Sequence, residues 1–132
     1  MTPALVLDAG ALIALDRNDR ATWAMLRVAA DSGTIIQVPA GVVAQAWRDG
    51  ARQVLLSRAL AHCDEVPLNG SVARLAGLLL SRSRTSDVID ATVALAAHGL
   101  NRTTKTVVLT SDPGDIKVLT DALDTPVRIE TV

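Results

Sequence analysis

Two short apolar stretches of this chain end in aspartates. Ala4–Leu7 is followed at once by Asp8, and Val107–Leu109 runs into the polar segment Thr110–Asp115, which has the sequence TSDPGD. Each apolar run has the length of a buried strand, and the Pro and Gly after the second run indicate a turn. In an open parallel sheet, ligands bind beyond the carboxyl ends of the strands. If both strands belong to one such sheet, we expect their aspartates to meet at the same edge.

Between these two strands, further strand-like runs alternate with segments whose apolar residues recur at helical spacing. The predicted strands are 4–7, 35–38, 65–68, 107–109 and 127–129, and the predicted helices are 11–15, 21–30, 39–60 with an interruption or bend at Gly50, 71–80, 87–98 and 115–123. This alternation is typical of an α/β fold with a mostly parallel central sheet. Pro67 favours an edge position for the strand 65–68, because proline cannot donate to a ladder.

The length of 132 residues predicts a single domain, residues 1–132, with a buried core. A hydrophobic fraction of 49% and a charged fraction of 20% are typical of globular proteins. No apolar run reaches the ~18 residues that a membrane-spanning helix needs, and the first residues show no secretory signal. We therefore expect no membrane association and a cytoplasmic location. The single cysteine, Cys63, excludes an intramolecular disulfide and a zinc site built from thiolates.

The net charge of -1 does not indicate a nucleic-acid-binding protein by itself. The chain has no Tyr or Phe and only two Trp, so it cannot build an extended platform on which bases stack. A bound nucleic acid would therefore be held through its phosphates. Arginine suits phosphate contacts, and Arg48, Arg82 and Arg84 are weak candidates, because each is better explained as an ordinary solvated surface residue.

Asp90 is the aspartate that is hardest to explain as a local structural residue. It is predicted to lie a full turn inside the helix 87–98, with Val93, Ala94 and Ala97 on the same side. Burying a carboxylate on such a face is unfavourable unless something compensates its charge. Asp87 lies on the same face, but the helix dipole stabilises an anion in the first turn without further help. Asp87 is therefore a supporting candidate only.

Asp8, Asp112 and Asp115 each have an ordinary interpretation as helix caps or turn residues. Gathered with Asp90, however, they would repel one another, and the repulsion would raise some of their pKa values. A bound Mg²⁺ or Mn²⁺ would remove this conflict, and such cations prefer oxygen ligands. We predict Asp8, Asp90 and Asp112 as metal ligands, with Asp115 as a further catalytic acid. This set suits metal-assisted hydrolysis of a phosphodiester.

Three segments carry a family resemblance: LVLDAGALIAL at 5–15, SDVIDA at 86–91 and LTSDPGD at 109–115. Their order and spacing resemble the PIN-domain ribonucleases, most of all the VapC toxins of bacterial toxin–antitoxin pairs. The resemblance implies a three-layer α/β/α sandwich, PIN-like, with Mg²⁺- or Mn²⁺-dependent cleavage of single-stranded RNA and inhibition by a VapB-like antitoxin. In this resemblance Asp8, Asp90 and Asp112 match three acids of the family site. Asp115 matches a further acid that some members have.

Two positions depart from the family pattern. The family usually has a glutamate on the helix after the second strand, where this chain has Gln45, which brings no charge to a metal. Asp49, predicted to lie four residues on along the same helical face, would replace it in part. Gly10 stands where many members have a hydroxyl residue. These departures keep a second interpretation open, in which a PIN-fold module binds RNA or an antitoxin without cutting.

Other α/β families with an aspartate at a strand end fit less well. A receiver domain would need a lysine at the end of a later strand, but Lys105 precedes its strand and Lys117 lies within a predicted helix. A haloacid-dehalogenase-like phosphatase would need a second aspartate at the position of Gly10. No Gly-x-Gly-x-x-Gly run is present, which disfavours dinucleotide binding.

Trp23 and Trp47 are the only aromatic residues of the chain. Both rings are expected in the core, although an exposed apolar helix pair near them would serve dimerisation or antitoxin docking. The expected partners are therefore a second copy of the chain, a small antitoxin protein and a single-stranded or structured RNA.

Overall fold

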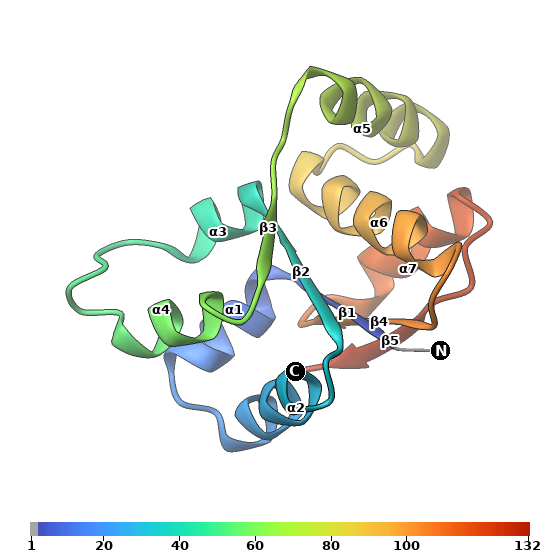
Figure 1. Ribbon diagram of the computed structural model, residues 1–132. Helices are drawn as coiled ribbons and strands as arrows, with labels where there is room; N and C mark the ends of the chain where they lie inside the picture. The colour runs from blue at the N-terminus through green and yellow to red at the C-terminus, as the bar shows by residue number, and fades with distance from the viewer. Residues whose placement is uncertain (1–2) are drawn as a thin grey trace.

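The computed structural model describes residues 3–132 and has a five-stranded sheet at its centre (Figure 1). The strand order is β3-β2-β1-β4-β5, and every neighbouring pair is parallel. The strands are β1 (Ala4–Leu7), β2 (Ile35–Pro39), β3 (Asp64–Val66), β4 (Thr106–Thr110) and β5 (Arg128–Thr131). The sheet predicted to be mostly parallel is thus parallel throughout. Leu7 pairs with Leu109, so β1 and β4 end at the same level.

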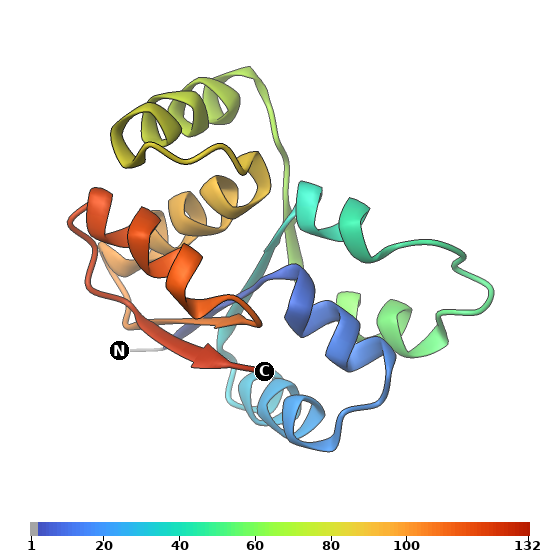
Figure 2. The ribbon, with the colours of Figure 1, turned by 180° about the vertical axis from the view of Figure 1, so that it is seen from behind.

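Helices cover both faces of the sheet, as Figures 1 and 2 show from opposite sides. One face carries α1 (Ala9–Asp16), α2 (Arg20–Asp31) and α4 (Val54–Leu60). The other carries α6 (Val88–Asn101) and α7 (Pro113–Ala122), with α5 (Gly70–Ser83) packed on both of these helices. The short helix α3 (Ala40–Ala46) contacts β2, β3, α1 and α6. The three-layer α/β/α arrangement is confirmed.

The apolar strands form the core because both of their faces are covered by helices. All four residues of β1 are buried. Leu7, Leu12 and Leu109 are among the largest side chains that are completely buried. The edge position of the strand before Pro67 is confirmed, although β3 ends at Val66 and Pro67 lies beyond it.

The junction between α5 and α6 differs from the prediction. Helix α5 continues to Ser83, and Arg84 ends it in the left-handed conformation, with φ of 59°. Helix α6 begins at Val88, where the Asp87 side chain accepts a hydrogen bond of 2.9 Å from the backbone N–H of Asp90. A carboxylate is an effective N-cap, and it shifts the start of the helix. The prediction that Asp90 lies a full turn inside the helix is therefore wrong, because Asp90 belongs to the first turn.

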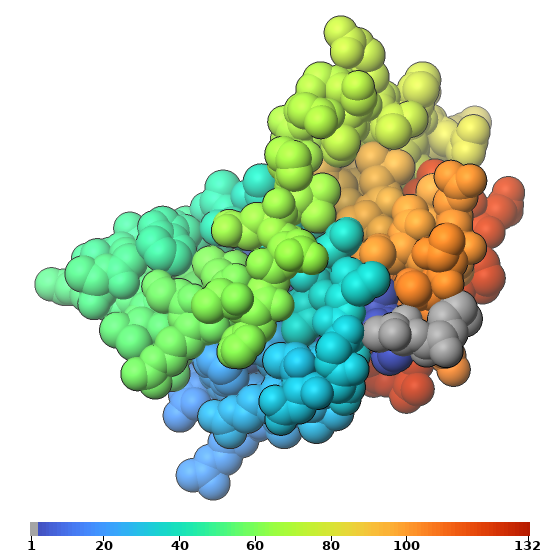
Figure 3. All heavy atoms as spheres, in the orientation of Figure 1, coloured from blue at the N-terminus to red at the C-terminus, as the bar shows by residue number. Residues whose placement is uncertain are grey.

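The segment between α3 and α4 is a loop that projects from the body of the molecule (Figures 1 and 3). Helix α3 ends at Ala46, and the buried side chain of Gln53 organises the chain that follows. Its Oε1 accepts hydrogen bonds from the backbone N–H groups of Arg48 and Asp49, at 2.7 and 2.9 Å, and its Nε2 donates to Ala46 O at 2.9 Å. The interruption predicted at Gly50 is confirmed, but it is a loop over residues 47–53 that ends the first helix before Trp47. Asp49 consequently does not share a helical face with Gln45.

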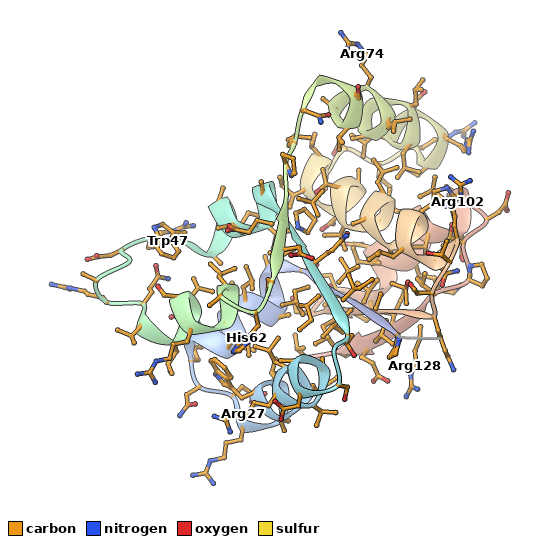
Figure 4. The ribbon with its side chains drawn as sticks, viewed as in Figure 1. Arg27, Trp47, His62, Arg74, Arg102 and Arg128 are labelled. Atoms are coloured by element: carbon orange, nitrogen blue, oxygen red, sulfur yellow. The ribbon has the colours of Figure 1, made fainter. Side chains whose placement is uncertain are left out.

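The two tryptophans have different environments. Trp23 is buried, as predicted, and its Nε1 donates a hydrogen bond of 2.9 Å to Leu15 O. Trp47 is 40% exposed, and Figure 4 shows it on the loop that leaves α3, so its predicted burial is wrong. Its ring lies against Gly50, where a Cβ would be 2.5 Å from Trp47 Cζ2.

Helix α7 begins two residues earlier than predicted, with Pro113 in its first turn and Asp112 as its N-cap residue. Proline is favoured at the first helical position because its missing N–H needs no partner there. Asp115 is therefore a first-turn residue rather than a cap.

Across residues 3–132, none of the helices is both long and apolar enough to cross a membrane. The prediction of one domain spanning residues 1–132 is not tested by these features and stays a prediction. Residues 1–2 lie outside the described part of the chain.

Candidate functional site

A buried hydroxyl joins the two aspartate segments at the carboxyl ends of β1 and β4. Thr110 is completely buried, and its Oγ1 donates a hydrogen bond of 2.7 Å to Asp8 Oδ2, across 102 sequence positions. The same oxygen accepts a hydrogen bond of 3.0 Å from the backbone N–H of Asp112. A second tie is the backbone bond of 2.9 Å from Asp8 N–H to Leu109 O. The strand register therefore places Asp8 beside the start of the segment that carries Asp112.

Asp8 is a buried carboxylate with both oxygens in hydrogen bonds. It is 3% exposed, and its Oδ1 accepts a bond of 2.7 Å from the backbone N–H of Ala9, at the start of α1. Its other oxygen accepts the bond from Thr110. Asp8 is therefore a helix cap, and this confirms one of the interpretations predicted for it. Its carboxylate is also held in one orientation at the edge of the sheet.

Asp90 is the electrostatic centre of the site. Burial raises the pKa of its carboxyl to about 7, and the negative charges of Asp87, Asp8, Asp115 and Asp112 contribute to the rise in that order. The four other acids are therefore close enough to act on Asp90, although they come from three separate parts of the sequence. None of the salt bridges within residues 3–132 involves any of these five acids. The site carries negative charge that no basic side chain of the described chain neutralises by direct pairing.

A hollow of about 250 Å³ opens beside Asp90, between the first turns of α6 and α7 and the loop that follows α5. The residues that line it are Thr85, Ser86, Asp87, Asp90, Asp115, Val118 and Leu119. Larger hollows elsewhere on the surface have mainly apolar linings, such as the one that Val43, Trp47 and Leu60 help to form. Because carboxyl groups with strongly shifted pKa values gather at functional sites, we take the acidic hollow that Asp90 lines as the candidate site in spite of its smaller size.

The donor atoms at this edge are carboxylate oxygens, which suit hard divalent cations such as Mg²⁺ and Mn²⁺. Within residues 3–132, no three His, Cys, Asp or Glu side chains form a group that could hold a metal ion directly. The donor set therefore fits an ion bound through one or two carboxylates and several waters, which is the usual pattern for Mg²⁺. It does not fit the closed four-ligand site of structural zinc. The roles of Asp8, Asp90 and Asp112 as metal ligands, and of Asp115 as a catalytic acid, stay predictions.

Gln45 is exposed on α3, and its position follows from a neighbouring glycine. Gly41 lies so close to Ile89 of α6 that a Cβ at Gly41 would collide with the Ile89 Cδ1 atom. Residues four apart share one helix face, so Gln45 lies on the side of α3 that is turned toward the start of α6. Because Gln45 stands where the resembling family has a glutamate of its site, we expect it to form a polar wall of the site, and this stays a prediction.

Asp49 lies in the projecting loop. Its Oδ1 accepts a hydrogen bond of 3.1 Å from the backbone N–H of Ala51, and its Oδ2 lies 3.6 Å from Arg52 Nε. Because α3 has already ended, the geometric reason for expecting Asp49 to replace a missing glutamate no longer holds. This correction leaves Gln45 without the expected acidic neighbour on its own helix.

At position 10, where the resembling family often has a hydroxyl residue, this chain has Gly10, and the Ser111 side chain lies against it. A Cβ at Gly10 would lie 2.6 Å from Ser111 Cβ and 2.9 Å from Ser111 N, so the Ser111 side chain fills the space that a side chain at position 10 would need. Sequence reasoning missed Thr110 and Ser111 as residues of this site and treated them as part of a turn. The available signal was their position between an apolar strand and Asp112.

The three arginines proposed for phosphate contacts are all exposed, but two are bound to backbone carbonyls. Arg48 Nη1 donates to Ala44 O and Trp47 O, at 3.1 and 2.8 Å. Arg82 Nη1 donates to Ala122 O at the end of α7, at 3.2 Å. Arg84 directly precedes Thr85, which lines the acidic hollow. Phosphate contact stays a prediction for all three, and Arg84 has the best position for it.

The chain's thiol is not suited to nucleophilic catalysis. Burial, together with the charges of Glu65 and Asp64, raises the pKa of Cys63 to about 12, so the reactive thiolate is scarce at neutral pH. Its Sγ donates a hydrogen bond of 3.3 Å to Ala59 O.

No protein-family model matches this sequence, and no curated protein matches it. Solved structures do match. The chain is similar to one in the crystal structure of VapBC2 from Rickettsia felis bound to a DNA fragment from their promoter, with 15% identity, a TM-score of 0.66 and coverage of 98% of both chains. It is also similar to one in the structure of FitAB bound to an IR36 DNA fragment, with 16% identity, a TM-score of 0.64 and coverage of 96% of this chain and 94% of the other.

These comparisons correct the family assignment. The identification of the chain as a PIN-domain ribonuclease of the VapC type is wrong as stated, because no family model supports it and the similar structures are two-component complexes at 15 and 16% identity. Similarity at this level establishes the fold alone. The chain has the PIN-like α/β fold with an all-parallel sheet, and its activity has to be argued from its own residues.

Proposed function

We propose that this protein is a metal-dependent endoribonuclease that cleaves single-stranded RNA. The observation that carries the proposal is the convergence of aspartates from separate segments at one edge of the sheet: a hydrogen-bonded Thr110 ties Asp8 to the segment of Asp112, and Asp87, Asp90 and Asp115 line one hollow. The raised pKa of Asp90 supports it. Carboxylates that repel one another are stabilised by a cation. A divalent cation held at one edge of an α/β sheet, beside an open hollow, suits hydrolysis of a phosphodiester.

We further propose that the protein is the toxin of a toxin–antitoxin pair and acts in the cytoplasm. The support is the likeness of almost the whole chain to structures of VapBC2 and FitAB, which are toxin–antitoxin complexes bound to DNA. Such a toxin would have a small antitoxin protein as its partner. Dimerisation of the toxin itself belongs to the same proposal and needs its own measurement.

In this proposal Asp8, Asp90 and Asp112 hold Mg²⁺ or Mn²⁺, directly or through water. The ion supplies a more acidic bound water and neutralises charge on the phosphate. Thr110 holds the Asp8 carboxylate in place through its hydrogen bond. Asp115, which lies in the first turn of α7 and lines the hollow, is proposed to accept a proton from water.

The proposed mode of RNA binding follows from the side chains available for contact with bases and phosphates. The chain lacks Tyr and Phe, so contact with the RNA depends on phosphates more than on base stacking. Arg84, which precedes the lining residues Thr85 and Ser86, is the arginine proposed to contact the strand as it enters the hollow.

The direct experiment is cleavage of single-stranded RNA oligonucleotides of mixed sequence with Mg²⁺, with Mn²⁺ and with EDTA. We expect cleavage with either metal, none with EDTA, and a loss of at least ~100-fold in Asp90→Asn, because metal catalysis supplies several kcal/mol. Asp121→Asn is the matched control, since Asp121 is an exposed acid on α7 that pairs with Lys117 outside the hollow. Cleavage that persists in EDTA, or that survives in Asp90→Asn, would contradict the proposal.

The second candidate function is a module that binds RNA or an antitoxin without cutting. Gln45 favours it, because this exposed residue on the α6 side of α3 brings no negative charge to the site. Gln45→Glu distinguishes the two candidates. If the parent protein binds RNA but does not cut it, while Gln45→Glu cuts with Mn²⁺, then the natural protein is the binding module. If the parent already cuts, the glutamine is compatible with catalysis.

A further inference from the structure

Ser111 is a polar residue at the acidic edge to which the proposed mechanism gives no role. It follows β4 directly and stands between Thr110, which binds Asp8, and Asp112. Ser111 is exposed. Within residues 3–132 its hydroxyl makes no hydrogen bond, in contrast to the buried hydroxyl of Thr110.

The position of Ser111 depends on Gly10. Glycine weakens a helix relative to alanine, so its place in the first turn of α1 calls for a reason. The reason is space, because a Cβ at Gly10 would lie 2.6 Å from Ser111 Cβ. It would also lie 2.9 Å from the Ser111 backbone nitrogen, so rotation of the serine side chain alone could not relieve the contact. Gly10 and Ser111 therefore form a complementary pair.

We infer that Ser111 is a substrate-binding residue whose hydroxyl donates a hydrogen bond to a non-bridging phosphate oxygen of the RNA at the acidic edge. The inference rests on the proposed function, because it needs a phosphodiester beside Asp8 and Asp112. The aspartates repel a phosphate, so neutral donors beside them are needed to hold it. The Ser111 hydroxyl is such a donor, free of any competing acceptor in the described chain and fixed at the end of a strand. Hydroxyl side chains commonly make phosphate contacts of this kind.

The test uses four variants and one control, measured by cleavage with Mn²⁺ and by binding of a fluorescent single-stranded RNA in EDTA. Ser111→Ala removes the hydroxyl. Gly10→Ala keeps the hydroxyl but pushes the serine away. The double variant Gly10→Ser/Ser111→Gly returns one hydroxyl to the same space from α1, and Gly10→Ala/Ser111→Gly fills that space without a hydroxyl. Ser81→Ala, an exposed serine on α5, is the control.

We expect Ser111→Ala and Gly10→Ala each to lose about tenfold in kcat/KM, as for one hydrogen bond to a charged group. The loss should be mainly in KM, with weaker RNA binding in EDTA and little change in Tm for Ser111→Ala. Gly10→Ser/Ser111→Gly should recover most of the lost kcat/KM. Gly10→Ala/Ser111→Gly should remain as low as Ser111→Ala. The control Ser81→Ala should match the parent.

Two results would overturn the inference. One is a parent enzyme that cuts while Ser111→Ala cuts and binds equally well, which refutes the role of Ser111 and leaves the nuclease proposal standing. The other is recovery in Gly10→Ala/Ser111→Gly, which would show that filled space rather than a hydroxyl matters. If the parent does not cut at all, the nuclease proposal fails separately, and the RNA-binding measurement still decides whether Ser111 contacts the strand.

Discussion

The two ends of the parallel sheet carry opposite kinds of surface. At the carboxyl end, beyond β1 and β4, five aspartates act on one another without pairing to any basic side chain in the described chain, and three of them line a hollow of about 250 Å³. Toward the amino end, a hollow of about 500 Å³ between the sheet and α2 has a mainly apolar lining, including Leu5, Met25 and Val28. The charged residues that line this apolar hollow, Arg128 and Glu130, both lie on β5 and form an ion pair. Figure 4 marks Arg128 beside the N-terminal part of the chain.

The two regions differ in whether their charged side chains have partners of opposite charge. Burial and like charges raise the pKa of Asp90 at the carboxyl end, while the ion pair at the amino end leaves no comparable conflict. Perturbed carboxyl groups gather at functional sites more often than at structural ones. This contrast is the reason for placing chemistry at the carboxyl end, and four measurements test it.

The largest expected effect is stabilisation by metal at the carboxyl end only. Mn²⁺ at a hundredfold excess over its dissociation constant should stabilise the protein by about 2.7 kcal/mol, and EDTA should reverse this. Asp90→Asn and Asp8→Asn should abolish the effect, whereas Glu130→Gln in the lining of the apolar hollow should retain it. The measurement is Tm against Mn²⁺ concentration. A Tm that does not respond to metal in the parent would remove the distinction between the two ends and favour the non-enzymatic module.

The next effect compares the two ends of a single strand. Thr110→Val at the carboxyl end of β4 removes the hydroxyl that serves Asp8 and Asp112, and we expect a loss of about 1–3 kcal/mol because buried polar groups lose their partner. Thr106→Val at the amino end is the control, since the Thr106 hydroxyl makes only a long bond of 3.4 Å to Thr104 O. Urea unfolding measures both. Equal losses would show that the hydroxyl between the aspartates has no special role.

A smaller effect concerns pH in the absence of metal. The Asp90 carboxyl has a pKa of about 7 in the folded protein against an ordinary value of 3.8. The folded state therefore holds a proton that the unfolded state releases, and stability falls as pH rises from about 4 to about 7. At pH 8 the metal-free Asp90→Asn variant should be the more stable protein, by about 1 kcal/mol once solvent screening is allowed for, or about 4 °C in Tm.

The same pair of proteins should show a much smaller difference at pH 4, where the carboxyl is protonated in the folded state and partly protonated in the unfolded state, whose pKa is near the ordinary 3.8. Identical pH profiles for the parent and Asp90→Asn between pH 4 and 8 would contradict the electrostatic account of the site. The profiles are measured by thermal unfolding in EDTA.

The smallest effect is expected at the apolar hollow. Glu130→Gln breaks the ion pair with Arg128, and because the Arg128 side chain is largely exposed, the change in stability should stay below about 0.5 kcal/mol. Its cleavage rate should remain within about twofold of the parent rate, since Glu130 lies on the edge strand β5 and lines the apolar hollow rather than the acidic one. A loss of activity comparable to that of Asp90→Asn would mean that the acidic edge is not the active region.

Much of the architecture could be predicted because it depends on local pattern. The strands β1, β2 and β4 are apolar runs long enough to be recognised, and their alternation with helical segments is enough to predict a parallel α/β sheet. Asp8 and Asp112 could be proposed for one edge because parallel strands end at the same side. The wrong helix boundaries lie where a single side chain forms hydrogen bonds with backbone N–H groups and so decides where a helix ends or begins. The side chain of Gln53 binds backbone N–H groups after α3, and that of Asp87 caps α6, so that the helix begins at Val88 rather than at residue 87.

The sequence by itself determined which residues could share an edge, because the order of strands and the aspartates that follow them are written along the chain. Only the tertiary structure decided that Thr110 binds Asp8, that Ser111 occupies the space beside Gly10, and that Asp49 lies on a loop away from Gln45. The physical reason is range. Periodicity and capping act over a few neighbouring residues, whereas a hydrogen bond or a steric contact between β1 and β4 is set by how the whole sheet packs.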